Sequence, residues 1–469
     1  MRITWCRGRW DSLAFLLVAL ALARGLTYGL LTPPWQAPDE PQHYQAVKLM
    51  MDLRQLTPTQ DGWSATTIPS EVYRSLQESH FWELRYRRPS PVAQDPQTAS
   101  ETLERENMTG AVSHPPLYYV LGALWLAPLR STTIWTQLYA LRLLSVLASV
   151  VSVWVVYRAG RWLSPEDDFR RLSAGLFVVF LPMHSFMGAT ASNDAMVEMW
   201  ASMMFLFLFW IGYYGLSTGR AVALLAALCL ALLTKRTSLF LIPVALVGVL
   251  SCPDVFHWWA RRFPCLKVRW GLWLLLSVVM GCALLIVLVA CSGRLGISWW
   301  DAADRLQQLT ERITSRGLDQ YVLHTLLGFA SFWANFGWMN IPLDIGWYII
   351  LAFISLGAGL GWLKMLLRSC RKQDGNPSVR WMWAVCGISL LLLAAQMSVS
   401  MIARDRPPQG RYLFPGMVPI ALCLIWGVFE WFPERYRAPV FWGLVVWWVF
   451  FDGAALFGYM LPYFYAGRM

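Results

Sequence analysis

The sequence predicts an all-α polytopic membrane protein with about eleven spanning helices, and three observations support that fold class. Apolar residues make up 57% of the 469 positions and charged residues 14%, whereas soluble domains are about 45–50% apolar and about 25% charged. The apolar residues come in blocks of roughly 18–22, the length of helix that crosses a hydrocarbon core of about 30 Å. The 28 Trp and 17 Tyr residues suit anchoring at the membrane interface.

We expect spans at the successive apolar blocks, including the first block of the chain. Residues 1–31 also resemble a signal peptide, but no convincing small-residue cleavage site follows them, so we expect a retained first helix. The expected spans are Ser12–Leu31, Gln137–Tyr157, Leu172–Gly188, Ala195–Tyr214, Ala221–Leu233, Ser238–Leu250, Gly271–Cys291, Gly346–Leu366, Trp381–Met401, Leu413–Glu430 and Val440–Tyr459.

Basic residues set the predicted orientation. Arg2, Arg7 and Arg9 precede the first span and place the N-terminus in the cytoplasm. Alternating spans then put four further basic segments on the same side, at residues 158–171, 261–269, 364–380 and 435–437. The pattern therefore predicts a multi-pass protein of the cytoplasmic (inner) membrane.

We expect a single transmembrane domain over residues 1–469, with two long extracytoplasmic segments at residues 32–136 and 292–345. The first segment far exceeds the median connection of about 4–6 residues and carries amphipathic helical patterns. Within it, the apolar stretch from Pro115 to Leu129 is too short for a typical span, and a full crossing would invert every later loop. We expect a helix that lies along the outer leaflet or dips into it.

Charge and cysteine content exclude some classes of partner and site. The net charge of +11 does not indicate a nucleic-acid partner, because the basic residues fall in the expected cytoplasmic loops and the expected partner is the lipid bilayer. None of the nine Cys residues lies between Thr32 and Thr136, and no Cys-x-x-Cys pair occurs. The long segment therefore has no predicted disulfide framework or cysteine metal site.

The motif APDEPQHY, at Ala37–Tyr44, is the strongest candidate for chemistry. Asp39, Glu40 and His43 lie just beyond the outer end of the first span, between prolines. A carboxylate in a partly desolvated cleft can activate a hydroxyl or an amine, so Asp39 and Glu40 are candidate catalytic residues. The alternative is that one of these carboxylates only caps the following helix.

Two further motifs add polar groups near the predicted membrane boundary. His114 precedes Pro-Pro in SHPPLY, at headgroup depth, where it is either a ligand for a phosphate or an ordinary boundary residue. Asp194 lies at the external mouth of the fourth span, and Glu198 follows one turn later. Charged residues at or inside a span suggest function, although Asp194 also suits a helix cap.

Basic residues cluster at two places that the orientation puts outside. Lys235 and Arg236 split two short apolar blocks in TKRT, and they suggest either an anionic partner or a salt bridge to Asp194 or Glu198. Arg404, Gln409, Arg411 and Tyr412 lie in ARDRPPQGRYLFP. The planar guanidinium group of arginine suits phosphate binding.

Two arginines lie in or near predicted spans without an evident role. We interpret Arg24, in the first span, and Arg142, near the start of the second, as residues whose charged ends reach the interface.

Taken together, these motifs resemble those of the GT-C superfamily of polyprenyl-phosphate-sugar-dependent glycosyltransferases. PDEPQHYQAVKLM is similar to the first-loop acidic motif of its aminoarabinose transferases and protein O-mannosyltransferases, and SNDAMVEM resembles their second acidic motif. SFWANFGW and QGRYLFP resemble a bacterial and archaeal group of the same clan whose activity is largely unassigned. The aminoarabinose transferases have an acidic-basic pair before Pro-Pro, where this chain has Ser113-His114.

The resemblance implies a GT-C-like bundle that transfers a sugar, with inversion, from a polyprenyl-phosphate-linked donor to a lipid, glycan or protein acceptor. Asp39 would orient or deprotonate the acceptor, with Glu40 beside it. No cofactor is certain, although a divalent metal between Asp39 and Asp194 is possible. The candidate substrate-binding residues are His43, His114, Asp194, Lys235, Arg236, Arg404, Gln409, Arg411 and Tyr412.

Two other interpretations stay open at this point. Charges at span ends also suit a transporter or flippase of an anionic lipid or solute, and a scaffold without activity would keep the same fold. No related halves are evident, whereas transporters often have them. An enzyme would gather its ionisable residues at the outer surface, and a transporter would gather them at mid-bilayer.

Overall fold

The computed structural model describes residues 12–53, 67–91, 96–105, 114–262, 318–371, 376–404 and 408–466. In this part of the chain almost all regular structure is helical, which confirms the predicted all-α class. The described residues form a single two-stranded antiparallel sheet, β1 (Asn335–Phe336) with β2 (Ile341–Pro342), in which Asn335 pairs with Pro342.

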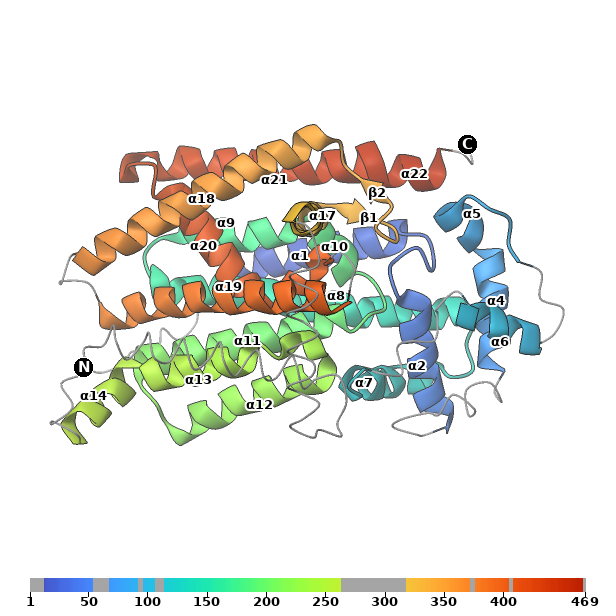
Figure 1. The fold of residues 1–469 in the computed structure, drawn as a ribbon, viewed down its shortest axis with the longest axis horizontal. Helices are drawn as coiled ribbons and strands as arrows, with labels where there is room; N and C mark the ends of the chain where they lie inside the picture. Colours follow the sequence, from blue (N-terminus) through green and yellow to red (C-terminus); the bar gives the residue numbers. More distant parts are fainter. Residues whose placement is uncertain are drawn as a thin grey trace.

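Long apolar helices run side by side and form the body of the molecule (Figure 1). Seven helical segments of the described chain are long and apolar enough to cross a membrane, or eight if one bent pair counts as a span. The main helices are α1 (Ser12–Leu31), α8 (Ile134–Leu163), α11 (Asp194–Tyr214), α18 (Ile345–Arg371), α19 (Pro377–Arg404), α20 (Met417–Phe429) and α21 (Arg437–Ala455).

The bent pair falls in the predicted span Leu172–Gly188. It consists of α9 (Asp168–Val179) and α10 (Pro182–Gly188), with axes that differ by 60°. Pro182 lacks the backbone N–H that a continuous helix would use, so the helix breaks just before it. The predicted span Leu172–Gly188 therefore corresponds to a broken helix, and its crossing of the membrane stays a prediction.

Two other predicted spans correspond to short helices. The blocks Ala221–Leu233 and Ser238–Leu250 form α12 (Thr218–Thr234) and α13 (Leu241–Ser251), which are 17 and 11 residues long and are joined by the short 3-10 helix η3 (Arg236–Ser238). The seventh predicted block, Gly271–Cys291, lies outside the described residues. The total of about eleven spans stays a prediction.

Residues of the first long segment form a separate group of short helices at one end of the bundle, at the right of Figure 1. We call this group the first-loop layer. Val47, Val72 and Leu76, which the amphipathic pattern placed on apolar faces, are all buried in its core. The layer comprises α2 (Glu40–Leu53), α4 (Ile68–Glu78), α5 (Phe81–Tyr86), α6 (Pro96–Arg105) and α7 (Leu117–Leu126), which η2 (Ala127–Leu129) extends.

The remaining elements close the two ends of the bundle. α14, which carries the basic pair Arg261 and Arg262, lies at the end opposite the first-loop layer (Figure 1). These elements are α14 (Pro253–Arg262), α17 (Leu318–Trp333), η4 (Gly410–Gly416), η5 (Glu434–Tyr436), the π-helical turn η6 (Leu456–Met460) and α22 (Leu461–Tyr465).

The arginines of the first two spans are held in ion pairs, Arg24 partly buried and Arg142 almost completely buried, which corrects the interpretation that their charged ends reach the interface. Arg24 pairs with Asp452 of α21, and the Tyr28 hydroxyl donates to the same carboxylate at 2.8 Å. Arg142 pairs with Glu40, and its side chain is 2% exposed. A charge this deep needs a fixed partner, since burial of an unpaired ion is costly.

Candidate functional site

Arg411 lies at the centre of a charged cluster that joins distant parts of the chain. Its side chain is only 1% exposed, and it extends from η4 at the start of the segment that leads into α20. Nη1 donates to Asp194 Oδ2 at 3.1 Å, Nη2 donates to Asp39 Oδ2, and Nε donates to Gln409 Oε1 at 2.6 Å. We call Asp39, Asp194, Lys235, Gln409 and Arg411 the Arg411 cluster.

Asp194 holds both cations of the cluster. It is the first residue of α11, where the positive end of the helix dipole favours a carboxylate. One carboxylate oxygen accepts from Arg411, and the other accepts from Lys235 Nζ at 2.5 Å. Because its side chain is 4% exposed, Asp194 is a buried anchor for the two basic groups.

Lys235 reaches Asp194 because the chain breaks between α12 and η3. Its backbone is extended, with φ −158° and ψ 140°. Gln396 of α19 stabilises the break, since its amide donates to the Thr237 carbonyl at 2.8 Å and accepts from the Phe240 N–H at 2.9 Å. Gln396 is not among the predicted site residues, although an amide in the middle of an apolar span was a visible signal.

Asp39 is the exposed carboxylate of the cluster, with 35% of its side chain accessible. It lies between α1 and α2 with φ 62°, a left-handed conformation that costs a non-glycine residue about 1–2 kcal/mol. Residues in such conformations gather at functional sites. Burial of the carboxyl raises the pKa of Asp39, but the charges of Arg411, His43 and Lys235 and the hydrogen bond from Arg411 together outweigh this and lower the pKa to about 2.

Two stacked imidazoles lie beside Asp39. The rings of His43, in α2, and His114, just before α7, are 5.9 Å apart with an angle of 27° between their planes. His43 Nδ1 lies 3.0 Å from the Tyr119 hydroxyl. Burial, together with the charge of Lys235 and other neighbours, lowers the pKa of His43 to about 3 and that of His114 to about 4. Both imidazoles are therefore neutral at pH 7.

Glu40, the second predicted catalytic residue, points away from the cluster. Its carboxylate accepts from Arg142 Nε at 2.8 Å and Nη2 at 2.7 Å, and from the backbone N–H groups of Trp35 and Ala191 at 3.0 and 3.1 Å. The side chain is fully buried. With both oxygens occupied, Glu40 has the environment of a structural residue, and the geometry does not favour the catalytic role that we predicted for it.

Arg142 also holds the chain on the other side of Asp39, between the end of α1 and Pro33. It donates to the carbonyl groups of Gly29 at 2.8 Å, Thr32 at 2.7 Å and Pro33 at 3.1 Å. The Glu40–Arg142 pair thus holds the end of α1 and the start of α2 in place.

The motifs SFWANFGW and QGRYLFP meet at Gly410, which precedes the central arginine. The Ser331 hydroxyl accepts from the Gly410 N–H at 2.7 Å. A Cβ atom at this glycine would lie 2.0 Å from the Phe332 backbone nitrogen. Only glycine allows so close an approach, so the two motifs together position Arg411.

The other predicted binding residues surround this core. The Tyr412 ring centre lies 5.5 Å from the Arg411 guanidinium carbon and 5.6 Å from Lys235 Nζ. Arg236 is exposed and pairs with none of the residues that the structure describes. Arg404 ends α19, but its side chain lies outside the described residues.

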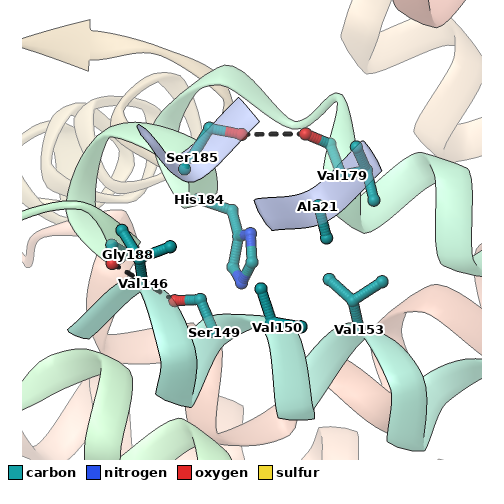
Figure 2. A pocket seen from close by; sticks show the side chains of 10 residues that line it. Ala21, Val146, Ser149, Val150, Val153, Val179, His184, Ser185 and Gly188 are labelled. Carbon is teal, nitrogen blue, oxygen red and sulfur yellow. Dashed lines mark hydrogen bonds between the residues drawn. The ribbon is translucent and has the colours of Figure 1, made fainter. Parts of the chain in front are cut away.

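A second titratable pair, which the sequence analysis did not identify, lies inside the bundle. His184 Nε2 is 2.9 Å from Glu198 Oε1, and both side chains are buried. His184 also borders a cavity of about 20 Å³, room for about one water molecule, with Ser149 on the opposite wall (Figure 2). No residue of the Arg411 cluster lines it, so this cavity is separate from the candidate site.

Metal binding receives no support from the described residues. They contain no group of three or more His, Cys, Asp or Glu side chains with suitable geometry. Asp39 and Asp194, which we considered as metal ligands, both contact Arg411. A metal requirement remains an untested prediction.

The fold and the site define a multi-pass membrane protein with a charged cluster between its helical bundle and a layer of short helices. Residues 22–420 match a family described as "Predicted membrane protein (DUF2142)", and the chain belongs to that family. No curated protein matches it in sequence.

Among solved structures, the chain is similar to the crystal structure of ArnT from Cupriavidus metallidurans bound to undecaprenyl phosphate. The identity is 16% and the TM-score 0.45, and the match covers 92% of this chain. This chain spans 62% of the length of the ArnT chain. At that distance the likeness does not assign an activity.

Proposed function

We propose that this protein is a glycosyltransferase that moves a sugar from a polyprenyl-phosphate carrier to an acceptor at the extracytoplasmic membrane face, with inversion. The observation that carries the proposal is the Arg411 cluster. Four separate segments bring one accessible carboxylate, Asp39, next to two buried cations, Arg411 and Lys235. A base beside fixed positive charge suits transfer away from a phosphate leaving group.

In the proposed reaction, Asp39 accepts the proton of the acceptor hydroxyl or amine. The acceptor atom forms a bond to the anomeric carbon on the face opposite the phosphate. The bond between that carbon and the phosphate oxygen breaks, and its electron pair stays on the oxygen. Arg411 and Lys235 stabilise the charge of the departing polyprenyl phosphate. A single displacement of this kind inverts the anomeric centre.

The neighbouring groups suit a sugar at this place. His43 and His114 are neutral, and a neutral imidazole both donates and accepts hydrogen bonds. Such groups recognise hydroxyls without adding charge. We propose that His114, the more accessible of the two, contacts the sugar, and that His43 orients it by stacking at 5.9 Å.

The transporter hypothesis has one observation in its favour. Arg24–Asp452 and His184–Glu198 are ionisable pairs inside the bundle, and such residues often mark transport pathways. In each pair, however, the two ionisable groups already bind each other. The cavity beside His184 has a volume of only about 20 Å³, which is too small for a lipid headgroup. We therefore favour the enzyme.

The proposal can be tested with purified protein in nanodiscs that contain a polyprenyl-phosphate sugar labelled in the sugar. A membrane extract supplies acceptors, and chromatography follows transfer of the label. We expect Asp39→Asn to lower the transfer rate by at least about 100-fold. Asp52→Asn is the matched control, because Asp52 lies on α2, the helix that directly follows Asp39, and pairs with Arg130 at 3.2 Å, outside the cluster.

Two results would count against the proposal. If the unaltered protein moves no label, the donor class is wrong. If Asp39→Asn transfers sugar as fast as the unaltered protein, Asp39 is not the base. Movement of labelled donor between leaflets without transfer would instead favour a flippase.

A further inference from the structure

The two buried cations of the Arg411 cluster are already bound to carboxylates. The guanidinium group of Arg411 contacts Asp39, Asp194 and Gln409, and Lys235 contacts Asp194. The two positive and two negative charges of the cluster therefore balance. A phosphate that binds these cations must displace one of the carboxylates, because a third anion beside them would meet like charge.

The two carboxylates are not equally easy to displace. Asp194 is 4% exposed, starts a helix and binds both cations. Asp39 is 35% exposed and, among the described residues, forms an ion pair with Arg411 alone. It also lies on a turn with φ 62°, so its contact is made from a strained backbone. Asp39 is therefore the carboxylate that a phosphate can displace from Arg411.

An exposed cation lies close enough to begin the exchange. Arg236 is adjacent in sequence to Lys235 and pairs with none of the described residues. Its charge also acts on His114, at the rim of the cluster. An approaching phosphate can meet Arg236 before it reaches the buried cations.

We propose that the phosphate of the lipid-linked donor binds Arg411 in the place of the Asp39 carboxylate, so that donor binding releases the base. This inference rests on the proposed function, because it locates the donor phosphate in the same site. The phosphate oxygens take over the Nη2 hydrogen bond, and no covalent bond changes. The freed Asp39 carboxylate then faces the acceptor. The base becomes available only when donor is present, which limits reaction of Asp39 with other molecules.

The exchange makes an unusual prediction for binding. Since binding and release are linked, removal of the competing carboxylate must strengthen the binding of phosphate. Asp39→Asn should therefore lose sugar transfer and yet bind a polyprenyl phosphate more tightly than the unaltered protein.

The test uses farnesyl phosphate, which lacks a sugar, and the purified full-length protein in detergent, with calorimetry to measure Kd. We expect Asp39→Asn to lower Kd by roughly tenfold. Asp52→Asn, which removes one negative charge on the neighbouring helix α2, should leave Kd unchanged. A gain of the same size in both variants would overturn the exchange, since it would reflect net charge only.

A double-mutant cycle shows whether the gain acts through Arg411. In an Arg411→Gln background, Asp39→Asn should no longer lower Kd. Arg411→Met, which also removes the positive charge, replaces Arg411→Gln if gel filtration shows that the glutamine variant does not fold. A full gain in either folded background would overturn the exchange.

The outcomes separate the exchange from the proposed activity. If the unaltered protein transfers sugar but Asp39→Asn binds farnesyl phosphate no more tightly, the exchange fails alone. If Asp39→Asn binds farnesyl phosphate more tightly but the unaltered protein transfers no sugar, the phosphate site is supported and the proposed activity is rejected. If no form binds farnesyl phosphate, the exchange fails, and the transfer assay alone decides the activity.

Discussion

Asp39 and Glu40 are neighbours in the sequence, and each binds an arginine from a distant segment, yet their environments differ sharply. Glu40 is fully buried and accepts two hydrogen bonds from Arg142 and two from backbone N–H groups. Asp39 is 35% exposed and its carboxylate contacts Arg411. One carboxylate holds the structure together, and the other can exchange its partner. The comparison teaches that the number of bonds and the access of solvent, not the residue type, separate the two roles.

The largest expected effect comes from breaking the buried pair. Glu40→Ala leaves Arg142 buried without its partner, which should destabilise the protein by about 3–5 kcal/mol. Thermal unfolding in detergent measures the loss. Glu83→Ala is the control, because Glu83 is 52% exposed and its pair with His80 should contribute at most about 1 kcal/mol. Equal stability of the two variants would contradict the structural role of Glu40.

The neighbouring carboxylate should show the opposite behaviour. Asp39→Asn should destabilise the protein less than Glu40→Ala does, because the buried Arg411 keeps the Asp194 carboxylate as its partner. The same variant should lose at least about 100-fold in transfer rate. A variant that unfolds as readily as Glu40→Ala would remove the distinction between the two residues.

A substitution at Gly410, where the two motifs meet, should have a smaller effect on stability and on phosphate binding. Gly410→Ala places a Cβ atom 2.0 Å from the Phe332 nitrogen, so η4 must shift, at a cost of roughly 1–3 kcal/mol. Arg411 shifts with it, and we expect weaker binding of farnesyl phosphate. Gly443→Ala is the control because a Cβ there meets no atom within 4 Å. Unchanged binding and stability in Gly410→Ala would show that this contact does not position Arg411.

The pH dependence of stability should give the smallest effect. Burial, and then the charge of His114, lowers the pKa of His43 from its ordinary 6.5 to about 3. Between these values the unfolded chain binds more protons than the folded one, so stability falls as the pH falls through this window. We expect His43→Gln to flatten that slope in thermal unfolding. An unchanged slope would show that His43 does not contribute to it.

The sequence predicted the fold class and several members of the cluster, because these depend on local signals. Apolar length predicts helices that can span a membrane, and charge at span ends pointed to Asp194, Lys235 and Arg411. The partners of those charges were not visible. Asp39 and Arg411 are 372 positions apart, and no periodicity connects them.

The differences between the sequence-based expectations and the structure have physical causes of the same kind. Glu40 looked like a second base because the turn at Asp39, with φ 62°, sends adjacent side chains to different partners. Arg24 looked like an interfacial residue because its partner Asp452 is 428 positions away. Pro182 was a readable signal for the break between α9 and α10, but apolar length was given more weight.

The most direct test of the account is a structure of the protein with a bound polyprenyl phosphate, determined by electron cryomicroscopy in nanodiscs. We predict that the phosphate lies within hydrogen-bond distance of Arg411 and Lys235, and that the Asp39 carboxylate has left Arg411. A phosphate bound elsewhere, with Asp39 still on Arg411, would contradict the account.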